Sequence, residues 1–163
     1  PPTRPSQARL AIVGKGPAED ELKQYFQGTN TKFMGLMQGE ALSRAYAAAD
    51  VFVMPSESET LGFVVLESMA SGVPPVCAAA GGLINLVRDE QTGCLFRPGD
   101  AADMTAQVRR LLDDAQLRAT MGQAGREETL RWDWRAATSV LRNLPNPNPL
   151  PGPHSDSDPD PDH

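Results

Sequence analysis

Short apolar runs alternate with amphipathic stretches along the first half of the chain, and this alternation predicts alternating strands and helices. The run 10–13 is continuously apolar and ends at the turn 14–17, a pattern typical of a strand buried on both faces of a parallel sheet. An amphipathic helix is predicted over 18–27, and a short strand follows near 32–34. Residues 40–49 repeat apolar positions at i, i+3, i+4 and i+7, which predicts a second helix.

The same alternation continues through the second half of the chain. The apolar run 51–54 predicts another buried strand, and the polar loop after it leads into a helix that ends at Gly72. The strand predicted at 74–78 contains Pro75, which fits only its first positions because proline cannot donate to a ladder. The later predicted elements are a short helix from 81 to about 89, a strand at 94–97, a helix after Asp100, a helix around 117–124 and a last helix at roughly 134–142. Together they predict an α/β fold, in which one continuous Rossmann-like parallel sheet has helices on both faces.

Composition divides the chain into a globular part and a tail. The 163 residues are 40% hydrophobic and 22% charged, which is ordinary for one domain with a core. The net charge is −6, but the stretch 145–163 holds four Asp and no Lys or Arg, which leaves −2 on the rest. We therefore predict a leader or truncated linker at 1–8, a domain at 9–143 and a disordered Pro/Asp-rich tail at 144–163. Because the chain begins with Pro1, we also expect it to be an excerpt of a longer protein.

Several classes of function are disfavoured by composition. The sequence lacks the stripe of basic residues that is typical of nucleic-acid binding. No apolar run approaches the ~18 residues of a membrane span. Cys77 and Cys94 form no CxxC pair, so we expect reduced thiols that fill the core. Both histidines lie in the tail, which argues against a Ser-His-Asp triad, a Cys-His pair or a His-rich metal site in the globular part.

The polar loop after the run 51–54 is the candidate binding site, because ligands of parallel α/β sheets bind at the carboxyl ends of strands. Thr60 is expected to cap the following helix, with its hydroxyl accepting from the N–H of Phe63. The free N–H groups around Leu61, Gly62 and Phe63 would then form an anion site, supported by the helix dipole. Gly62 would allow a ligand to approach the backbone closely.

Two carboxylates flank this predicted anion site. Glu59 precedes the expected cap, and Glu67 follows Thr60 by seven residues, which is ~10 Å along a helix axis. This arrangement suits a sugar diphosphate, whose phosphates would meet the N–H groups while the carboxylates accept from hydroxyls. It does not suit a glycosidase pair that must flank one bond. Two Glu eight residues apart are also common on a solvated helix face, so that alternative stays open.

Residues 55–74 resemble the E-x7-E signature of retaining glycosyltransferase family 4, with Glu59 and Glu67 as its two acids. Within that family, the sequence of this segment is most similar to the plant, algal and cyanobacterial sulfoquinovosyltransferases of sulfolipid synthesis. The likeness covers about residues 8–143. Further matching segments are 14–17, 33–35, 49–51, 81–82, 92–96, 126–129 and 133–138.

The resemblance implies the C-terminal, nucleotide-sugar-binding domain of a GT-B enzyme, whose active site lies in a cleft between two Rossmann-like domains. It implies that Glu59, the catalytic candidate, holds the donor sugar and that Glu67 holds the ribose hydroxyls. Main chain around Leu36 would meet the uracil, and Gly16 is a candidate on the phosphate side, although a simple turn role is the alternative. The remaining donor-binding candidates are Thr60, Leu61, Gly62 and Phe63.

The resemblance also implies the reaction and its partners. The donor would be UDP-sulfoquinovose and the acceptor diacylglycerol, with retention through a front-face mechanism in which the departing phosphate takes the acceptor proton. No metal or other cofactor is expected. Because an upstream Arg/Lys pair and the acceptor domain are missing, we expect the excerpt alone to be inactive. Membrane contact would be peripheral, through the missing N-terminal domain, on a chloroplast envelope or thylakoid membrane or on the cytoplasmic membrane face of a bacterium.

Two alternatives remain. The first is another family 4 hexosyltransferase, with a different UDP- or GDP-sugar and acceptor. The second is a noncatalytic nucleotide-sugar-binding module. Its support is the missing half and a few departures from the usual family residues, at Pro75, Ala79, Ile84 and Asn85.

Overall fold

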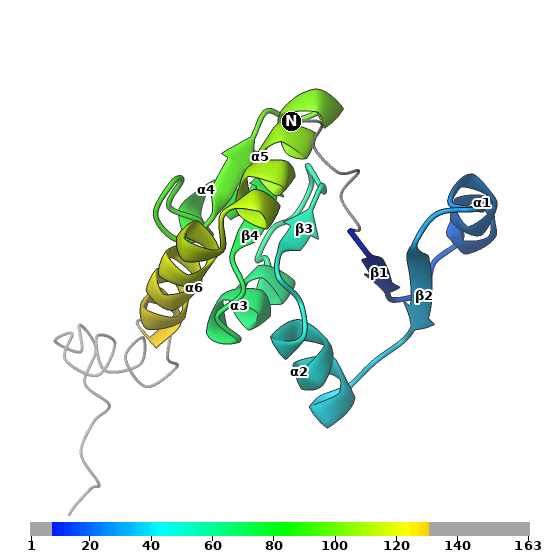
Figure 1. Ribbon diagram of the computed structural model, residues 1–163, viewed down its shortest axis with the longest axis horizontal. Coiled ribbons are helices and arrows are strands. Elements are labelled where there is room, and N and C mark those ends of the chain that lie inside the picture. The colour runs from blue at the N-terminus through cyan, green and yellow to red at the C-terminus, as the bar shows by residue number, and fades with distance from the viewer. Residues whose placement is uncertain (1–7, 131–163) are drawn as a thin grey trace, which may run out of the picture. The chain divides into compact units, whose positions relative to one another are not determined.

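The computed structural model describes residues 8–130, where strands and helices alternate as predicted up to the fifth strand and two more helices follow (Figure 1). The strands are β1 (Leu10–Val13), β2 (Thr31–Gly35), β3 (Phe52–Met54), β4 (Pro75–Ala78) and β5 (Cys94–Phe96). The helices are α1 (Glu19–Tyr25), α2 (Gly39–Ala47), α3 (Phe63–Ala70), α4 (Leu83–Leu86), α5 (Ala101–Asp113) and α6 (Ala115–Thr129). Nearly all of the predicted leader, the helix predicted at 134–142 and the acidic tail lie outside the described residues.

The strands form two parallel sheets instead of the single continuous sheet that we predicted. One sheet pairs β1 with β2, and the other has the order β3-β4-β5. The prediction was wrong because an apolar run identifies a strand but not its neighbour. Among the described residues β1 has β2 as its partner and β3 has β4, so no ladder joins β1 to β3.

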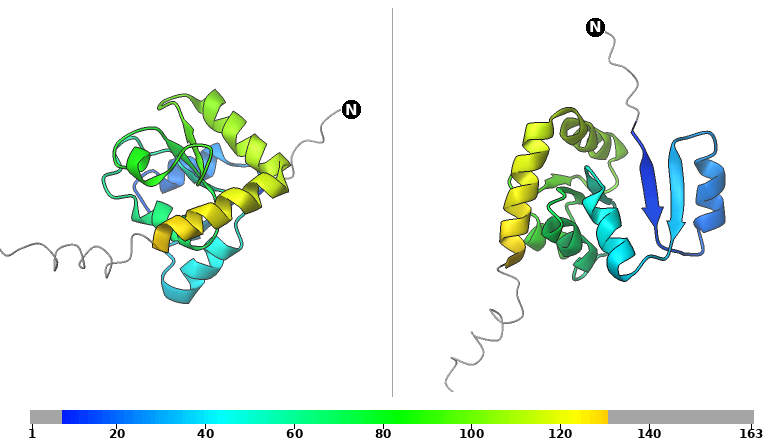
Figure 2. Two further views of the ribbon diagram at one scale, coloured as in Figure 1. Left: turned by 90° about the vertical axis from the view of Figure 1, so that its left-hand side faces the viewer. Right: turned by 60° about the horizontal axis from the view of Figure 1, so that its bottom comes forward.

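The three-stranded sheet carries the core and is covered on both faces, as predicted. Successive side chains of a strand point to opposite faces, and β4 accordingly sends Cys77 to one cluster and Val76 and Ala78 to the other. One face packs against α3 and α4, through Val65, Met69, Leu83, Leu86 and Val87. The opposite face packs against α5 and α6, through Leu111 and Met121 (Figure 2).

The strand β1 is not buried, contrary to its continuously apolar sequence. Leu10 and Val13 each remain 41% exposed. The sheet to which β1 belongs has two strands, and Phe26, which follows α1, packs on it with its ring 6.4 Å from that of Phe33 on β2. An apolar parallel strand is normally covered on both faces. The apolar sequence of β1 therefore predicted more burial than the described residues give it.

Local signals at the ends of the elements were read correctly in several places. Pro75 is the first residue of β4, where its missing N–H is tolerated. Asp100 caps α5, with its Oδ1 accepting from the N–H of Asp103 at 2.9 Å. Gly72 has φ +74° just after α3 ends, as expected of a C-terminal glycine. Within residues 8–130, no helix combines the length and apolarity that crossing a bilayer requires.

Candidate functional site

The loop between β3 and α3 follows the carboxyl end of a core strand, as predicted, but the helix begins later than expected. Its first residue is Phe63, and the N-cap is Gly62 in the left-handed conformation at φ +63°. A Cβ at Gly62 would lie 2.6 Å from the side chain of Leu86 and 3.1 Å from that of Leu83. The prediction that Thr60 caps α3 is therefore wrong, because two leucines of α4 and a left-handed glycine fix the start of the helix.

Glu59 satisfies the loop amides in place of Thr60. Its Oε1 accepts from the N–H of Gly62 at 2.9 Å and from the N–H of Leu61 at 3.2 Å. Two of the three predicted N–H donors, those of Leu61 and Gly62, therefore converge on the same carboxylate oxygen. Charge-assisted hydrogen bonds of this kind are stronger than neutral ones, so the loop has the chemistry of an anion site. In the free protein, the anion that it holds is its own carboxylate.

The backbone of Glu59 and Thr60 rests on the glycine pair after β4. The N–H of Gly82 donates to the carbonyl of Glu59 at 2.9 Å. A Cβ at Gly81 would lie 2.4 Å from that same carbonyl oxygen, and one at Gly82 would lie 2.1 Å from the carbonyl oxygen of Thr60. This role was missed from the sequence, where the pair was treated as a match to the family and as the start of a helix. The available signal was its position just after β4, the neighbour of β3.

Glu67 is nearer to the start of α3 than we expected. It lies four residues after Phe63, which is ~6 Å along the axis at 1.5 Å per residue. Its side chain is exposed, and its Oε2 accepts a hydrogen bond from the hydroxyl of Tyr46 on α2 at 3.0 Å. Both acids of the motif are thus held by hydrogen bonds, Glu59 by backbone amides and Glu67 by a tyrosine.

Tyr46 is a site residue that sequence reasoning missed, because its helical spacing indicated only a packing position. The ring is half-buried and lies 5.7 Å from the ring of Phe52 on β3. Burial, and then the hydrogen bond to Glu67, raise the pKa of Tyr46 well above its ordinary value. The phenol therefore stays protonated and donates to the carboxylate across the whole working range of pH.

Leu36 and Gly16 lie at the carboxyl end of the other sheet. Leu36 follows β2 and is 70% exposed. The side chain of Lys15 approaches to 3.7 Å from the position that a Cβ at Gly35 would take, so that it lies over the end of β2. The carbonyl of Gly16 accepts from the N–H of Glu19 at 3.1 Å, which is ordinary turn geometry. Among residues 8–130, no hydrogen bond links either candidate to the Glu59 loop, and their roles in donor binding stay predictions.

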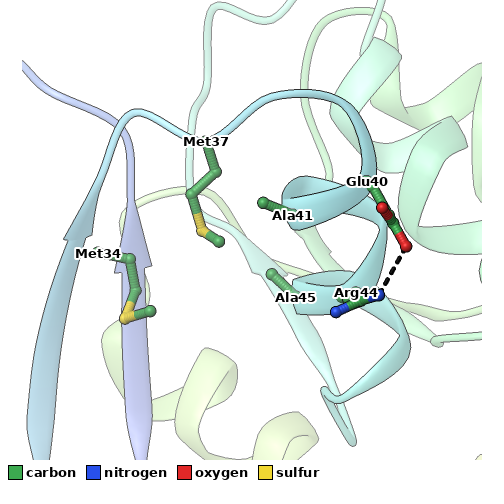
Figure 3. A pocket seen from close by; sticks show the side chains of 6 residues that line it. All are labelled: Met34, Met37, Glu40, Ala41, Arg44 and Ala45. Carbon is green, nitrogen blue, oxygen red and sulfur yellow. Dashed lines mark hydrogen bonds and ion pairs between the residues drawn. The ribbon is translucent and has the colours of Figure 1, made fainter.

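An open hollow of about 460 Å³ lies where the chain passes from β2 to α2. Figure 3 shows Met34 and Met37 on one side and Ala41 and Ala45 of α2 on the other. A salt bridge at its rim joins Arg44 to Glu40 at 2.7 Å. Sequence reasoning did not identify this hollow, although Met34 and Met37 were visible. Its lining is mainly apolar, because the two charged residues in it pair with each other, and it suits the face of a flat ring or an aliphatic group more than a charge.

No metal or thiol chemistry is indicated within the described part of the chain. There, no three His, Cys, Asp or Glu side chains are grouped closely enough to bind a metal ion. Cys77 and Cys94 are buried and belong to opposite faces of the sheet. Burial raises the pKa of Cys77 to about 12 and that of Cys94 to about 11. Both are therefore free thiols buried in the core, as predicted.

Comparison with known proteins gives a consistent result. Residues 3–128 match the family model for glycosyl transferases, group 1. The chain is 51% identical over 140 residues to sulfoquinovosyl transferase SQD2 of Arabidopsis thaliana, which covers 84% of this chain and 28% of that protein. It is 38% identical over 112 residues to a D-inositol 3-phosphate glycosyltransferase of Salinispora arenicola, which covers 69% of this chain and 25% of that protein. The chain thus spans between a quarter and a third of the length of these relatives.

Solved structures agree with the fold. Sucrose-phosphate synthase from Thermosynechococcus elongatus matches with a TM-score of 0.74 at 34% identity, over 83% of this chain and 38% of that one. HepE from Anabaena, solved in complex with UDP, matches with a TM-score of 0.74 at 26% identity, over 86% of this chain and 41% of that one.

Proposed function

Because this chain belongs to the group 1 glycosyl transferase family, we propose that it is the donor-binding part of a longer retaining glycosyltransferase. That enzyme would transfer sulfoquinovose from UDP-sulfoquinovose to diacylglycerol. The 51% identity to a sulfoquinovosyl transferase supports this choice of substrates. The observation that carries the proposal is the hydrogen bonding of Leu61 and Gly62, whose amides hold the Glu59 carboxylate just before the helix that carries Glu67.

The carboxylate of Glu59 stands in for the anionic part of a donor. A diphosphate that approaches the start of α3 would meet the N–H groups of Leu61 and Gly62 and would be favoured by the helix dipole. Glu59 would then leave these amides and accept hydrogen bonds from the hydroxyls of the donor sugar. Glu67 would accept from the ribose hydroxyls, because its carboxylate is exposed. The uracil would lie against the main chain at Leu36.

The chemistry that follows requires no base from this chain. The bond between the anomeric carbon and the β-phosphate of UDP breaks, and the departing phosphate oxygen takes the proton of the acceptor hydroxyl. The acceptor oxygen bonds to the anomeric carbon on the face that UDP leaves, which retains the configuration. The role of the chain is to bind the diphosphate and to orient the sugar. Such a role fits a described region that offers backbone donors and carboxylates at the loop.

The proposed reaction also indicates where the enzyme would work. Diacylglycerol is a membrane lipid, so the longer protein would contact a bilayer peripherally, through its acceptor-binding part. The 51% identity to a sulfoquinovosyl transferase of Arabidopsis supports a chloroplast membrane as this location, with the cytoplasmic membrane face as the alternative if the source is a bacterium.

A transfer assay with the longer protein tests this proposal. The donors would be UDP-sulfoquinovose, UDP-glucose, UDP-galactose and GDP-mannose, each with diacylglycerol in mixed micelles. We expect sulfolipid from the first donor alone, and we expect Glu67→Ala to reduce its formation severely. Glu57→Ala is the matched control, since Glu57 is an exposed carboxylate of the same loop.

A second candidate is a group 1 enzyme with another donor, which the 38% identity to a D-inositol 3-phosphate glycosyltransferase favours. Transfer from one of the other donors would establish it. The third candidate, a noncatalytic nucleotide-sugar-binding module, predicts no transfer from any donor and no loss of the protein's function in Glu67→Ala.

A further inference from the structure

We propose that Tyr46 is a positioning residue, which fixes the carboxylate of Glu67 in the orientation that binds the ribose of the donor. This inference rests on the proposed function of the site. Its starting point is the hydrogen bond from the Tyr46 hydroxyl to Oε2 of Glu67 at 3.0 Å, which joins two residues 21 positions apart in the sequence.

The two partners differ in their freedom to move. Glu67 is exposed and, as a long flexible side chain, would sample several rotamers without a partner. Tyr46 is half-buried, and its ring packs beside Phe52 on β3. The phenol is therefore a fixed donor on the neighbouring helix, and it determines where one oxygen of the flexible carboxylate lies.

The hydrogen bond leaves the other carboxylate oxygen for a ligand. Within residues 8–130, no side chain or backbone donor occupies Oε1 of Glu67, and no basic group forms an ion pair with it. A carboxylate has about four acceptor positions, so that one bond from Tyr46 still allows both hydroxyls of a ribose to donate. The orientation is then set before the donor arrives, and its entropic cost does not count against binding.

In a purely structural role, the same hydrogen bond would only stabilise the position of α2 relative to α3. The two roles make different predictions, because a structural bond changes the free energy of unfolding whatever the ligand is. A positioning role affects only ligands that carry the hydroxyls that Glu67 contacts. Removing the phenol oxygen while keeping the ring separates them, since Tyr46→Phe preserves the packing beside Phe52.

The test is a binding titration of the longer protein with UDP and with 2′,3′-dideoxy-UDP. The variants are Tyr46→Phe, Glu67→Ala and the double variant, with Tyr25→Phe as control, because Tyr25 is 80% exposed on α1. We expect Tyr46→Phe to weaken UDP binding about 3- to 10-fold, in line with the freedom of one released side chain. We expect no change for dideoxy-UDP and no further loss when Tyr46→Phe is added to Glu67→Ala. In the transfer assay, we expect Tyr46→Phe to raise the KM for the donor.

Three results would overturn the inference. They are equal weakening of both nucleotides, additive losses in the double variant, and unchanged UDP binding by Tyr46→Phe when Glu67→Ala weakens it. The last result would leave the proposed function standing, because the preference for UDP over dideoxy-UDP would still depend on Glu67. A wild-type protein that binds neither nucleotide would overturn the proposed function together with this inference. Urea midpoints of all variants show whether a loss comes from unfolding.

Discussion

The carboxylate of Glu59 accepts a hydrogen bond from the backbone N–H of Gly62, with 2.9 Å between its Oε1 and the nitrogen. The same carboxylate also accepts from the N–H of Leu61. In the free protein, the amides proposed to bind a diphosphate are thus satisfied by the residue proposed to bind the sugar. Glu59 therefore stabilises the loop in the free protein, and this role is separable from the role in sugar binding that we propose for it.

Substitution of Glu59 should separate those two roles. Glu59→Ala removes the acceptor of two loop amides and should lower the free energy of unfolding by about 1 kcal/mol, as the loss of an ordinary hydrogen bond does. It should not weaken UDP binding, because the amides become free for the diphosphate, whereas transfer should be lost. Urea unfolding and UDP titration check these outcomes, with Glu57→Ala as control. Weaker UDP binding by Glu59→Ala would show that the amides do not receive the phosphates.

The glycine pair after β4 should be sensitive to a single methyl group. Gly82→Ala would place a Cβ 2.1 Å from the carbonyl oxygen of Thr60, so we expect a loss of about 1–3 kcal/mol from overpacking and weaker donor binding. Gly16→Ala is the control for stability, because no atom lies within 4 Å of its Cβ position. Thermal unfolding of both variants gives the measurement, and equal midpoints would contradict the close packing.

The pattern of hydrophobic positions predicted most elements correctly, because each apolar run is short and is bounded by glycine, proline or polar residues. It could not predict where α3 begins, since that depends on Leu83 and Leu86 of another element, which pack against Gly62. The loop setting and the family resemblance made Glu59 and Glu67 candidates, but neither could find Tyr46, whose partner lies 21 residues away. The pairing of strands was likewise outside the reach of local pattern, so that the division into two sheets was missed.

The uneven cover of the two sheets predicts uneven protection from hydrogen exchange. β4 is the central strand of its sheet and is buried along its whole length, whereas three of the four residues of β1 are exposed. In this 163-residue chain, amides of Val76–Ala78 should therefore exchange by global opening. Those of Leu10–Val13 should exchange at least an order of magnitude faster. Equal protection by NMR or mass spectrometry would contradict this difference.

The two thiols predict a loss of stability at high pH. The unfolded chain releases their protons near pH 9, but burial keeps the folded pKa of Cys94 at about 11 and that of Cys77 at about 12. The unfolded state therefore binds fewer protons above pH 9, and stability falls as pH rises through this window. The urea midpoint should decrease between pH 8 and pH 10, and by less in a Cys77→Ala/Cys94→Ala variant.

The same thiols should be unreactive in the folded protein. At pH 8, Ellman's reagent should modify neither cysteine in buffer and both in urea, because both side chains are buried. Rapid modification of the native chain would show that the faces of the sheet open more readily than their packing indicates.

We propose that a nucleotide-sugar donor binds at the start of α3, with Glu67 as a direct ligand. Calorimetric titration of the longer protein with UDP, for the wild type, Glu67→Ala and Glu57→Ala, tests this binding mode. We expect Glu67→Ala to weaken binding by about 1.5–3 kcal/mol, from the loss of charged hydrogen bonds, and Glu57→Ala to bind as the wild type does. Equal affinity of all three proteins would show that Glu67 is not a ligand of the donor.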